Sequence, residues 1–305
     1  MDKARKKTDK MLKKTERKFS KIYKDADAKA ITKMRAYLFT IEDDENRMRR
    51  LYKTKAITRK EYADWRQKTL LTGDKWRKVK QNIAFEYVNA NQAAMALTND
   101  LVDDVFVVNY NYMTDKLNGL VAAVMASPTV LKIPNISTTE RLKTRPELRP
   151  KNVKVPKDLR WNENKINAEV LKGIQKGESM DKIAKRLRNV TDMDRKAAIR
   201  NARTMVTSAE NGARQATAEE MGKIGVPTVK QWVAVGDERT RESHLDLDGE
   251  TVMYNDSFSN GLMFAGDPSG DYAEVFNCRC STDYMIREEL LPQTNLKEAE
   301  RFEGY

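Results

Sequence analysis

An α+β fold that is mainly α-helical is predicted for this chain of 305 residues, and three observations predict it. Apolar residues recur at three- and four-residue steps over long stretches, which is the period of an α-helix. Ala, Lys, Glu, Arg, Met and Leu dominate the composition, and most of them favour helices. Strand-like alternation begins only after residue 227. We therefore expect a long-helix N-terminal region, a helical platform and a small, turn-rich, β-containing C-terminal module.

The N-terminal region, residues 1–126, carries two helical stripes of apolar residues. The first extends from Phe19 to Ile41, and the second extends from Tyr62 to Val105, with a charged break at residues 42–45 between them. Stripes of this kind form when one face of a helix is buried against another helix. We expect a basic helical domain of long helices that pack on one another.

Positive charge is concentrated near the N-terminus. Residues 1–90 hold 27 Lys and Arg against 13 Asp and Glu, a net charge of +14, whereas the whole chain carries +12. Such an asymmetry indicates a polyanionic neighbour, with double-stranded DNA as the first choice. Acidic protein surfaces would attract the same charge, and a solvated helix surface is the alternative without a partner.

Five of the eight prolines lie between Pro128 and Pro156. Proline ends helices and favours extended chain, so residues 127–160 are predicted to form a Pro-rich linker or arm. The next domain is expected over residues 161–290, helices first and then the small β module, followed by a C-terminal tail at 291–305.

Local signals place the helices of this second domain. One helix with Ile166 and Ile174 on its apolar face ends at Gly177, and Ser179 can cap the next. The sequence Thr191-Asp192-Met193-Asp194 resembles a capping box and predicts the start of a long helix that runs to Gly222. After Pro227, the segment from Val229 to Val235 has the pattern of a strand.

Several classes of protein are excluded by what the sequence lacks. No apolar run approaches the roughly 18 to 20 residues that cross a bilayer, so no membrane partner is expected. The two cysteines, separated by one residue, form no disulfide framework and are expected as thiols in a reducing compartment. Phosphate-binding loops, dinucleotide-binding glycine motifs and the nucleophile elbow of a hydrolase are missing from the sequence.

The residues that carry most information lie after the predicted strand. They comprise an acidic and arginine-rich turn, the single histidine of the chain, an Asp-Gly turn and a returning segment with two thiols: Trp232, Asp237, Arg239, Arg241, His244, Asp248, Gly249, Asn277, Cys278, Arg279 and Cys280. If Cys278 and Cys280 lie on a strand, both sulfurs point to the same face. With His244 they would supply three ligands of a tetrahedral zinc site, the fourth being Asp246, Asp248 or water. The alternative is a pair of buried thiols beside a hydrogen-bonded histidine, with no cofactor.

Two interpretations remain for the charged residues of this segment. The three arginines can pair with the aspartates in bidentate hydrogen bonds that hold a small module together. Alternatively, His244 acts as a base and the arginines bind phosphate, which would make a metal-dependent nuclease or hydrolase centred on His244, Cys278 and Cys280. The structural interpretation is favoured, so no catalytic residue is assigned.

At these residues the chain resembles the phage Mu F-like head-morphogenesis family, the minor head or minor capsid proteins of tailed bacteriophages. The shared pattern is Trp232, Asp237-x-Arg239-Thr240-Arg241-x-x-His244, Asp248-Gly249 and Asn277-Cys278-Arg279-Cys280. The resemblance covers roughly residues 160 to 286, including the helix through Asn211. Met205 in that helix stands where the family commonly has an acidic residue.

The resemblance implies a function in the virion. Such proteins bind the portal protein at one vertex of the capsid, influence head assembly with the major capsid or scaffolding protein, and contact or leave with the DNA. We therefore expect a non-enzymatic minor head protein located in the capsid interior near the portal vertex, and in the host cytoplasm during assembly.

Overall fold

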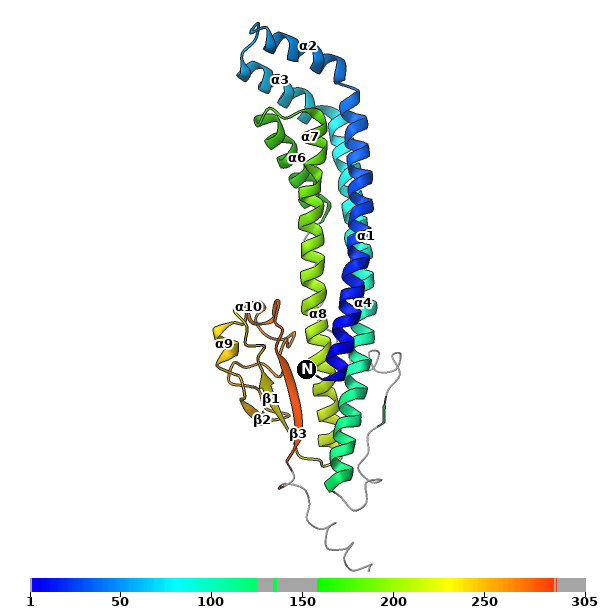
Figure 1. The fold of residues 1–305 in the computed structure, drawn as a ribbon, viewed down its shortest axis with the longest axis vertical. Coiled ribbons are helices and arrows are strands. Elements are labelled where there is room, and N and C mark those ends of the chain that lie inside the picture. Colours follow the sequence, from blue (N-terminus) through cyan, green and yellow to red (C-terminus); the bar gives the residue numbers. More distant parts are fainter. Residues whose placement is uncertain (1, 125–133, 136–157, 288, 290–305) are drawn as a thin grey trace, which may run out of the picture. The chain divides into compact units, whose positions relative to one another are not determined.

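The computed structural model describes residues 2–124, 134–135, 158–287 and 289 (Figure 1). Long helices dominate these residues, and one small antiparallel sheet lies near the C-terminal end, so the predicted fold class is confirmed. The predicted linker or arm at 127–160 lies almost entirely outside the described residues, and the predicted tail at 291–305 lies wholly outside them. Within the described part of the chain, the helices are too polar to cross a lipid bilayer.

The elements follow the predicted order of long helices first and short strands last. The helices are α1 (Lys3–Phe39), α2 (Glu42–Lys53), α3 (Arg59–Leu71), α4 (Gly73–Val124), α6 (Leu159–Gln175), α7 (Met180–Lys185), α8 (Leu187–Lys223), α9 (Glu242–Leu245) and α10 (Tyr272–Val275). The strands are β1 (Thr228–Val233), β2 (Thr251–Met253) and β3 (Ser281–Ile286).

The chain divides into two compact units that both draw on α1, α4 and α8. The helical unit comprises Glu16–Leu97 and Lys154–Ile199, and the sheet unit comprises Met1–Thr15, Thr98–Val153 and Arg200–Tyr305. Each unit is described separately below.

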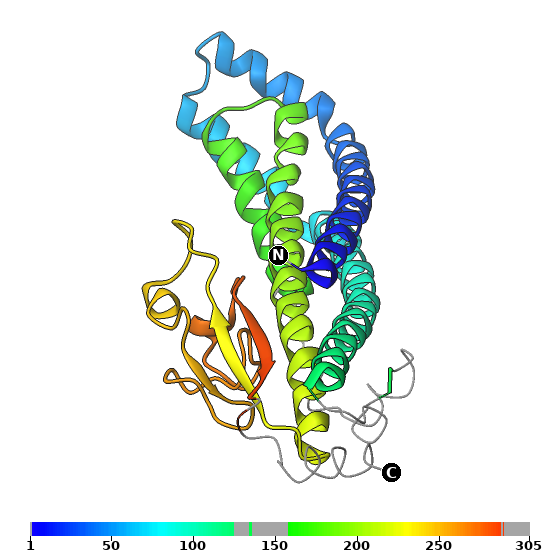
Figure 2. The same cartoon turned by 60° about the horizontal axis from the view of Figure 1, so that its bottom comes forward.

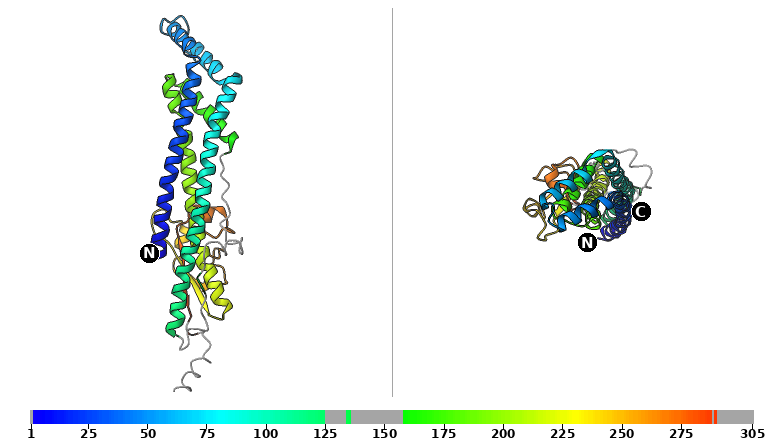
Figure 3. Two further views of the ribbon diagram at one scale, coloured as in Figure 1. Left: turned by 90° about the vertical axis from the view of Figure 1, so that its right-hand side faces the viewer. Right: turned by 90° about the horizontal axis from the view of Figure 1, so that it is seen from above.

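The core of the helical unit is formed by the apolar faces of its long helices, and Figure 3 shows α1 beside α4. Phe19 and Met34 from α1, Ile83 from α4 and Ile166 from α6 are each fully buried. Polar contacts fix how the helices pair. Tyr23 donates a hydrogen bond to Asn91 at 2.6 Å, and Asn91 donates to Asp194 at 3.2 Å, which links α1, α4 and α8.

Helix boundaries in this unit follow local chemistry, with one correction. Gly177 has a φ of +68° after α6, and the Ser179 hydroxyl accepts a hydrogen bond from the Lys182 amide, as predicted. The predicted capping box at Thr191 is wrong, because α8 begins four residues earlier, at Leu187. The Thr191 hydroxyl instead donates back to the Leu187 carbonyl within the helix.

The second predicted stripe is divided between two helices. Thr72 ends α3 in an extended conformation, and Gly73, with a φ of +85°, begins α4. Glycine adopts a φ of this size more readily than any other residue, so the helical stripe changes direction at this residue. The N-terminus of α3 has a full capping box between Thr58 and Glu61.

In the sheet unit, three antiparallel strands lie beside the C-terminal part of α8 (Figure 2). The strand order is β2-β1-β3, with Trp232 opposite Thr282 and Val229 opposite Met253. An apolar cluster attaches the sheet to the helices through residues of α4, α8, the loop after α8 and β3: Met113, Leu117, Val121, Ala218, Met221, Val226 and Tyr284.

Candidate metal centre

Trp232 is the anchor of the small module. It lies on β1 with no exposed surface, and it packs with Leu247, Phe258 and Leu262. Its ring meets the ring of His244 edge-on at 5.1 Å and the ring of Phe258 at 5.2 Å. The predicted motif residue Trp232 therefore holds His244 in place by packing.

The turn after β1 is closed by Asp237 and Arg279. The Asp237 carboxylate accepts hydrogen bonds from the Arg239 amide at 3.1 Å and from the Thr240 hydroxyl at 3.2 Å. Both its oxygens also accept from the Arg279 guanidinium, one at 2.6 Å. Hydrogen bonding to Arg279 holds the pKa of Asp237 below its usual range. This is the bidentate pairing that the sequence indicated, with one arginine of the three.

The other two arginines have different roles. Arg241 donates to the carbonyl oxygen of Phe276, which links the turn to the segment before the cysteines. Arg239 has a largely exposed side chain, 3.8 Å from the nearer Asp237 oxygen. The predicted pairing of arginines with Asp246 and Asp248 is not among the contacts of the described residues: Asp246 is exposed, and Asp248 accepts from the Ala234 amide at 2.8 Å.

The Asp-Gly turn returns the chain to β1. The Gly249 amide donates to the Trp232 carbonyl at 2.9 Å, and Gly249 has a φ of +85°. Only glycine adopts this conformation without strain. Asp248 and Gly249 thus fix the loop that carries His244, and neither contacts the histidine in the described contacts.

The two cysteines lie in the extended segment just before β3, and not on a strand. Asn277, at a φ of +57°, turns the chain after α10, and β3 begins at Ser281. Three side chains of α8 hold this segment. Thr204 accepts from the Asn277 amide at 3.1 Å, Thr207 donates to the Cys278 carbonyl at 3.0 Å, and Asn211 donates to the Cys280 carbonyl at 3.2 Å. No sequence pattern indicated the roles of Thr204 and Thr207.

The structure brings the three predicted metal ligands together. His244 Nδ1 lies 3.7 Å from Cys278 Sγ and 3.5 Å from Cys280 Sγ, and the three ligand atoms all lie within 4.8 Å of one another. All three residues are buried. On the other side of the ring, His244 Nε2 is 2.7 Å from a carboxylate oxygen of Glu274 on α10. Sequence reasoning missed Glu274, which is one of many acidic residues and matches no spacing motif.

Hydrogen bonds within this cluster shift the pKa values of His244, Cys278 and Cys280. Hydrogen bonding from Cys278, with help from His244 and the Val235 amide, lowers the pKa of the Cys280 thiol to about 4. Hydrogen bonding to Cys280 and burial raise the pKa of Cys278. Burial opposes a charge on His244, but hydrogen bonds to Cys280 and Glu274 outweigh it and raise the pKa of the imidazole.

A small hollow adjoins the cluster, with a volume of about 10 Å³. Its wall consists of nine residues from the turn after β1, from α9 and from the segment before β3: Val235, Arg239, Thr240, Arg241, His244, Asn277, Cys278, Arg279 and Cys280. A space of this size holds about one water molecule. Sites for small-molecule ligands occupy roughly 300 to 1,000 Å³.

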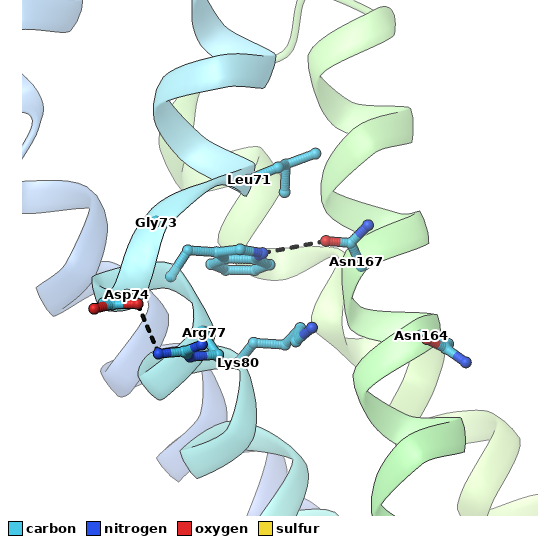
Figure 4. Close-up of a pocket in the computed structure, with 8 residues that line it drawn as sticks. Leu71, Gly73, Asp74, Arg77, Lys80, Asn164 and Asn167 are labelled. Carbon is cyan, nitrogen blue, oxygen red and sulfur yellow. Dashed lines mark hydrogen bonds and ion pairs between the residues drawn. The ribbon is translucent and has the colours of Figure 1, made fainter.

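A larger cleft of about 410 Å³ lies in the helical unit between α4 and α6 (Figure 4). Trp76 donates a hydrogen bond across it to Asn167 at 3.1 Å. Its cations are already paired with carboxylates: Arg77 with Asp74 at 2.7 Å, and Lys80 with Glu163 at 3.7 Å. No His, Cys or nucleophile–base pair lines this cleft, so nothing at its described walls indicates catalysis.

Comparison with known proteins gives one family and several relatives. Residues 164–283 match the family described as Phage Mu protein F like protein. The chain is 25% identical over 222 residues to the Minor head protein GP7 of Bacillus phage SPP1. The aligned region covers 70% of this chain and 67% of that protein. No solved structure matches.

Two further relatives match over shorter regions. One is the NAD(+)--arginine ADP-ribosyltransferase EFV of Enterococcus faecalis, 30% identical over 145 residues, or 46% of this chain and 30% of that protein. The other is the Uncharacterized protein YqbB of Bacillus subtilis, 27% identical over 146 residues, or 45% of this chain and 47% of that protein. The chain thus spans less than half of each of these two relatives.

The family match contains the β1 turn, the histidine loop and the Cys-x-Cys segment, which are also the parts that the structure assembles around Trp232. Over residues 164–283 this chain is therefore similar to the Phage Mu protein F like family.

Proposed function

We propose that this protein is a minor head protein of a tailed bacteriophage, which associates with the portal protein and the packaged DNA and acts in head assembly. The observation that carries the proposal is the similarity to the Minor head protein GP7 over 222 residues. That similarity is longer than the family segment at 164–283, so it includes helical regions outside the module. Similarity that extends beyond the family segment favours a shared role for the two proteins.

In this proposal the protein resides in the virion, in the capsid interior near the portal vertex, after assembly in the host cytoplasm. The major capsid or scaffolding protein is a further partner, and the protein contacts DNA during packaging or ejection. Its role needs no turnover of a substrate.

The surface of α1 supports the contact with DNA. Basic residues recur along this helix at steps of four and three residues, which places them on one face: Lys3, Lys7, Lys10, Lys14, Arg17, Lys21 and Lys24. All seven are exposed, and none forms an ion pair among the described contacts. A row of unneutralised cations is the form of surface that binds a phosphate backbone without reading sequence.

The size of the hollow beside His244 supports a non-enzymatic role. At about 10 Å³ it admits a water molecule and excludes a nucleotide or a DNA strand. The similarity to an ADP-ribosyltransferase covers 30% of that protein, and a dinucleotide needs a far larger cavity than this hollow. The alternative, a metal-dependent hydrolase centred on His244, is disfavoured for the same reason.

The direct test is to mix the purified chain with the portal protein of the same phage and to measure the mass of the complex during size-exclusion chromatography. We expect a stoichiometric complex that survives the column. If the two proteins elute separately, and the chain instead cleaves DNA in the presence of a metal ion, the hydrolase takes the place of the head protein.

Binding to DNA is tested separately with charge variants. Replacing Lys3, Lys7, Lys10 and Lys14 by Gln should weaken binding to duplex DNA and flatten its dependence on salt, because fewer counterions are released. The matched control replaces four exposed lysines on or near α2 and α3, Lys53, Lys55, Lys60 and Lys68, with the same change in net charge. Equal loss in both variants would contradict a specific role for the α1 face.

A further inference from the structure

The geometry of His244, Cys278 and Cys280 points to a metal ion, and we propose that they bind one structural zinc ion. In a tetrahedral site with Zn–S of about 2.3 Å and Zn–N of about 2.05 Å, a ligand nitrogen and a ligand sulfur lie about 3.6 Å apart. The Nδ1 atom of His244 lies 3.7 and 3.5 Å from the two sulfurs. Both nitrogen–sulfur distances therefore match those of a single zinc site, and all three ligand atoms lie within 4.8 Å of one another.

The orientation of the histidine is the second, independent observation. Its Nε2 atom is hydrogen-bonded to Glu274 at 2.7 Å, and the Ser243 hydroxyl donates to the same carboxylate oxygen at 3.2 Å. With the proton on Nε2, the lone pair of Nδ1 points at the two sulfurs. Histidines that bind zinc commonly donate their other N–H to a carboxylate, which fixes the tautomer and the ring. Glu274 is therefore a positioning residue for the ligand.

The fourth position of the tetrahedron belongs to water. The sequence suggested Asp246, Asp248 or water. Among the described residues no carboxylate lines the hollow beside the cluster, and the Asp248 side chain accepts a hydrogen bond from the Ala234 amide. The hollow has the volume of about one water molecule. Two thiolates balance the charge of the ion, and thiolate with imidazole in a four-coordinate site favours zinc over magnesium or calcium.

The ion would join two parts of the module that are far apart in the sequence. His244 lies on α9, a helix of four residues, and the cysteines lie in an extended segment 34 and 36 residues later. In Figure 1, α9 and α10 lie together beside the sheet. Zinc bonds replace apolar burial where elements are too short to supply it, so the ion holds the histidine loop against the start of β3.

The experiment measures zinc in the purified full chain by elemental mass spectrometry, and then by cobalt substitution. We expect one zinc ion per chain, and a cobalt form with sulfur-to-metal charge-transfer bands and strong tetrahedral ligand-field bands. Chelation should lower the Tm, and added zinc, but not magnesium, should restore it. A folded chain that holds no zinc after incubation with excess ion, with a Tm insensitive to it, would overturn the proposal.

Variants locate the site. Cys280→Ser should lose the charge-transfer bands and most of the zinc, and Glu274→Gln, which leaves all three ligands in place, should weaken zinc binding about 10- to 100-fold. Asp246→Asn is the matched control, an exposed carboxylate two residues from His244, and should bind zinc as the unmodified chain does. Full zinc binding by both Cys280→Ser and Glu274→Gln would place the ion elsewhere and refute this site. Failure of the portal complex would leave this result unaffected.

Discussion

The helical unit and the sheet unit are stabilised in different ways. In the helical unit, buried apolar residues repeat along helices that are many turns long. The loss of one apolar contact therefore leaves many equivalent contacts on the same helix face. In the small module of the sheet unit, β2 has three residues and α9 and α10 have four each. Elements this short cannot be stable by periodic burial, so single residues such as Trp232 and Asn211 connect them.

This difference teaches where sequence signals are to be found. The helical unit, which has many equivalent apolar contacts, is recognised in the sequence by a repeating pattern. The small module, which depends on individual contacts, is recognised only by a motif of particular residues. The family match over residues 164–283 includes the module, where the particular residues are. Perturbations should therefore have local, large effects in the module and distributed, smaller effects in the helices.

The largest effect is expected for Trp232→Ala. Removing a fully buried tryptophan costs about 3 to 5 kcal/mol, because the neighbours cannot fill the cavity. Urea unfolding measures the loss, and hydrogen-exchange mass spectrometry locates it. We expect faster exchange in residues 226–286 and unchanged protection in residues 16–97. The partly exposed neighbour Val233→Ala should cost far less, and uniform loss of protection would contradict the distinction between the units.

The next effect lies in the helical unit, at its buried ion pair. Glu45 and Arg66 have side chains only 2% exposed and 3.4 Å apart, and Tyr62 donates to Glu45 at 2.5 Å. Glu45→Ala should cost about 3 kcal/mol, at the low end for breaking a buried pair, because Arg49 at 3.2 Å connects the site to solvent. The double variant with Arg66→Met should lose less than the sum of the single variants. Strict additivity in chemical denaturation would show that the two charges do not interact.

A matched pair of asparagines compares the units directly. Asn211 on α8 donates to Ala265 at 2.8 Å and to Cys280 at 3.2 Å, and accepts from the Thr282 amide at 2.9 Å. Asn189 in the helical unit donates to Glu169 at 2.8 Å at a partly buried site. Asn211→Ala should cost about 1 to 3 kcal/mol, because it leaves buried backbone groups unpaired. Asn189→Ala should cost less, and equal losses in urea unfolding would contradict the comparison.

How far the sequence predicts the structure follows the same division. The long helices, the cap at Ser179 and the strand near Val229 follow from periodicity and local chemistry. The start of α8 was mispredicted because a threonine hydroxyl can accept a hydrogen bond as a helix cap or donate one inside a helix. The Thr191 hydroxyl does the second and donates to the Leu187 carbonyl within α8. The break at Gly73 was missed because a stripe of apolar residues is compatible with one helix or two.

The candidate site was predicted in part. His244, Cys278 and Cys280 are rare residue types, so they stand out in the sequence, and the structure places them together. Glu274 could not be found, since a common acidic residue gains its role only from a fold that brings α10 beside α9. Lys230 is a further example: within a strand pattern a lysine normally faces solvent, yet here it is fully buried.

The smallest effect is a pH dependence that belongs to Lys230. Its ammonium group donates to the carbonyls of Met263 at 2.6 Å and Tyr254 at 3.0 Å, and burial lowers its pKa to about 8, against the opposing charges of Asp256, Asp267 and Glu219. The ordinary pKa of lysine is about 10.4. Between these values the unfolded chain binds a proton that the folded protein does not, so raising the pH through this window stabilises the fold. Below pH 8 both states are protonated, and the cost of burying the charge is fully present.

In urea unfolding at pH 7 to 9.5, the stability of the unmodified chain relative to Lys230→Met should therefore rise with pH, because other titrating groups cancel in the difference. A constant or falling difference would mean that the charge of Lys230 is as well solvated by its two carbonyls as it is by water.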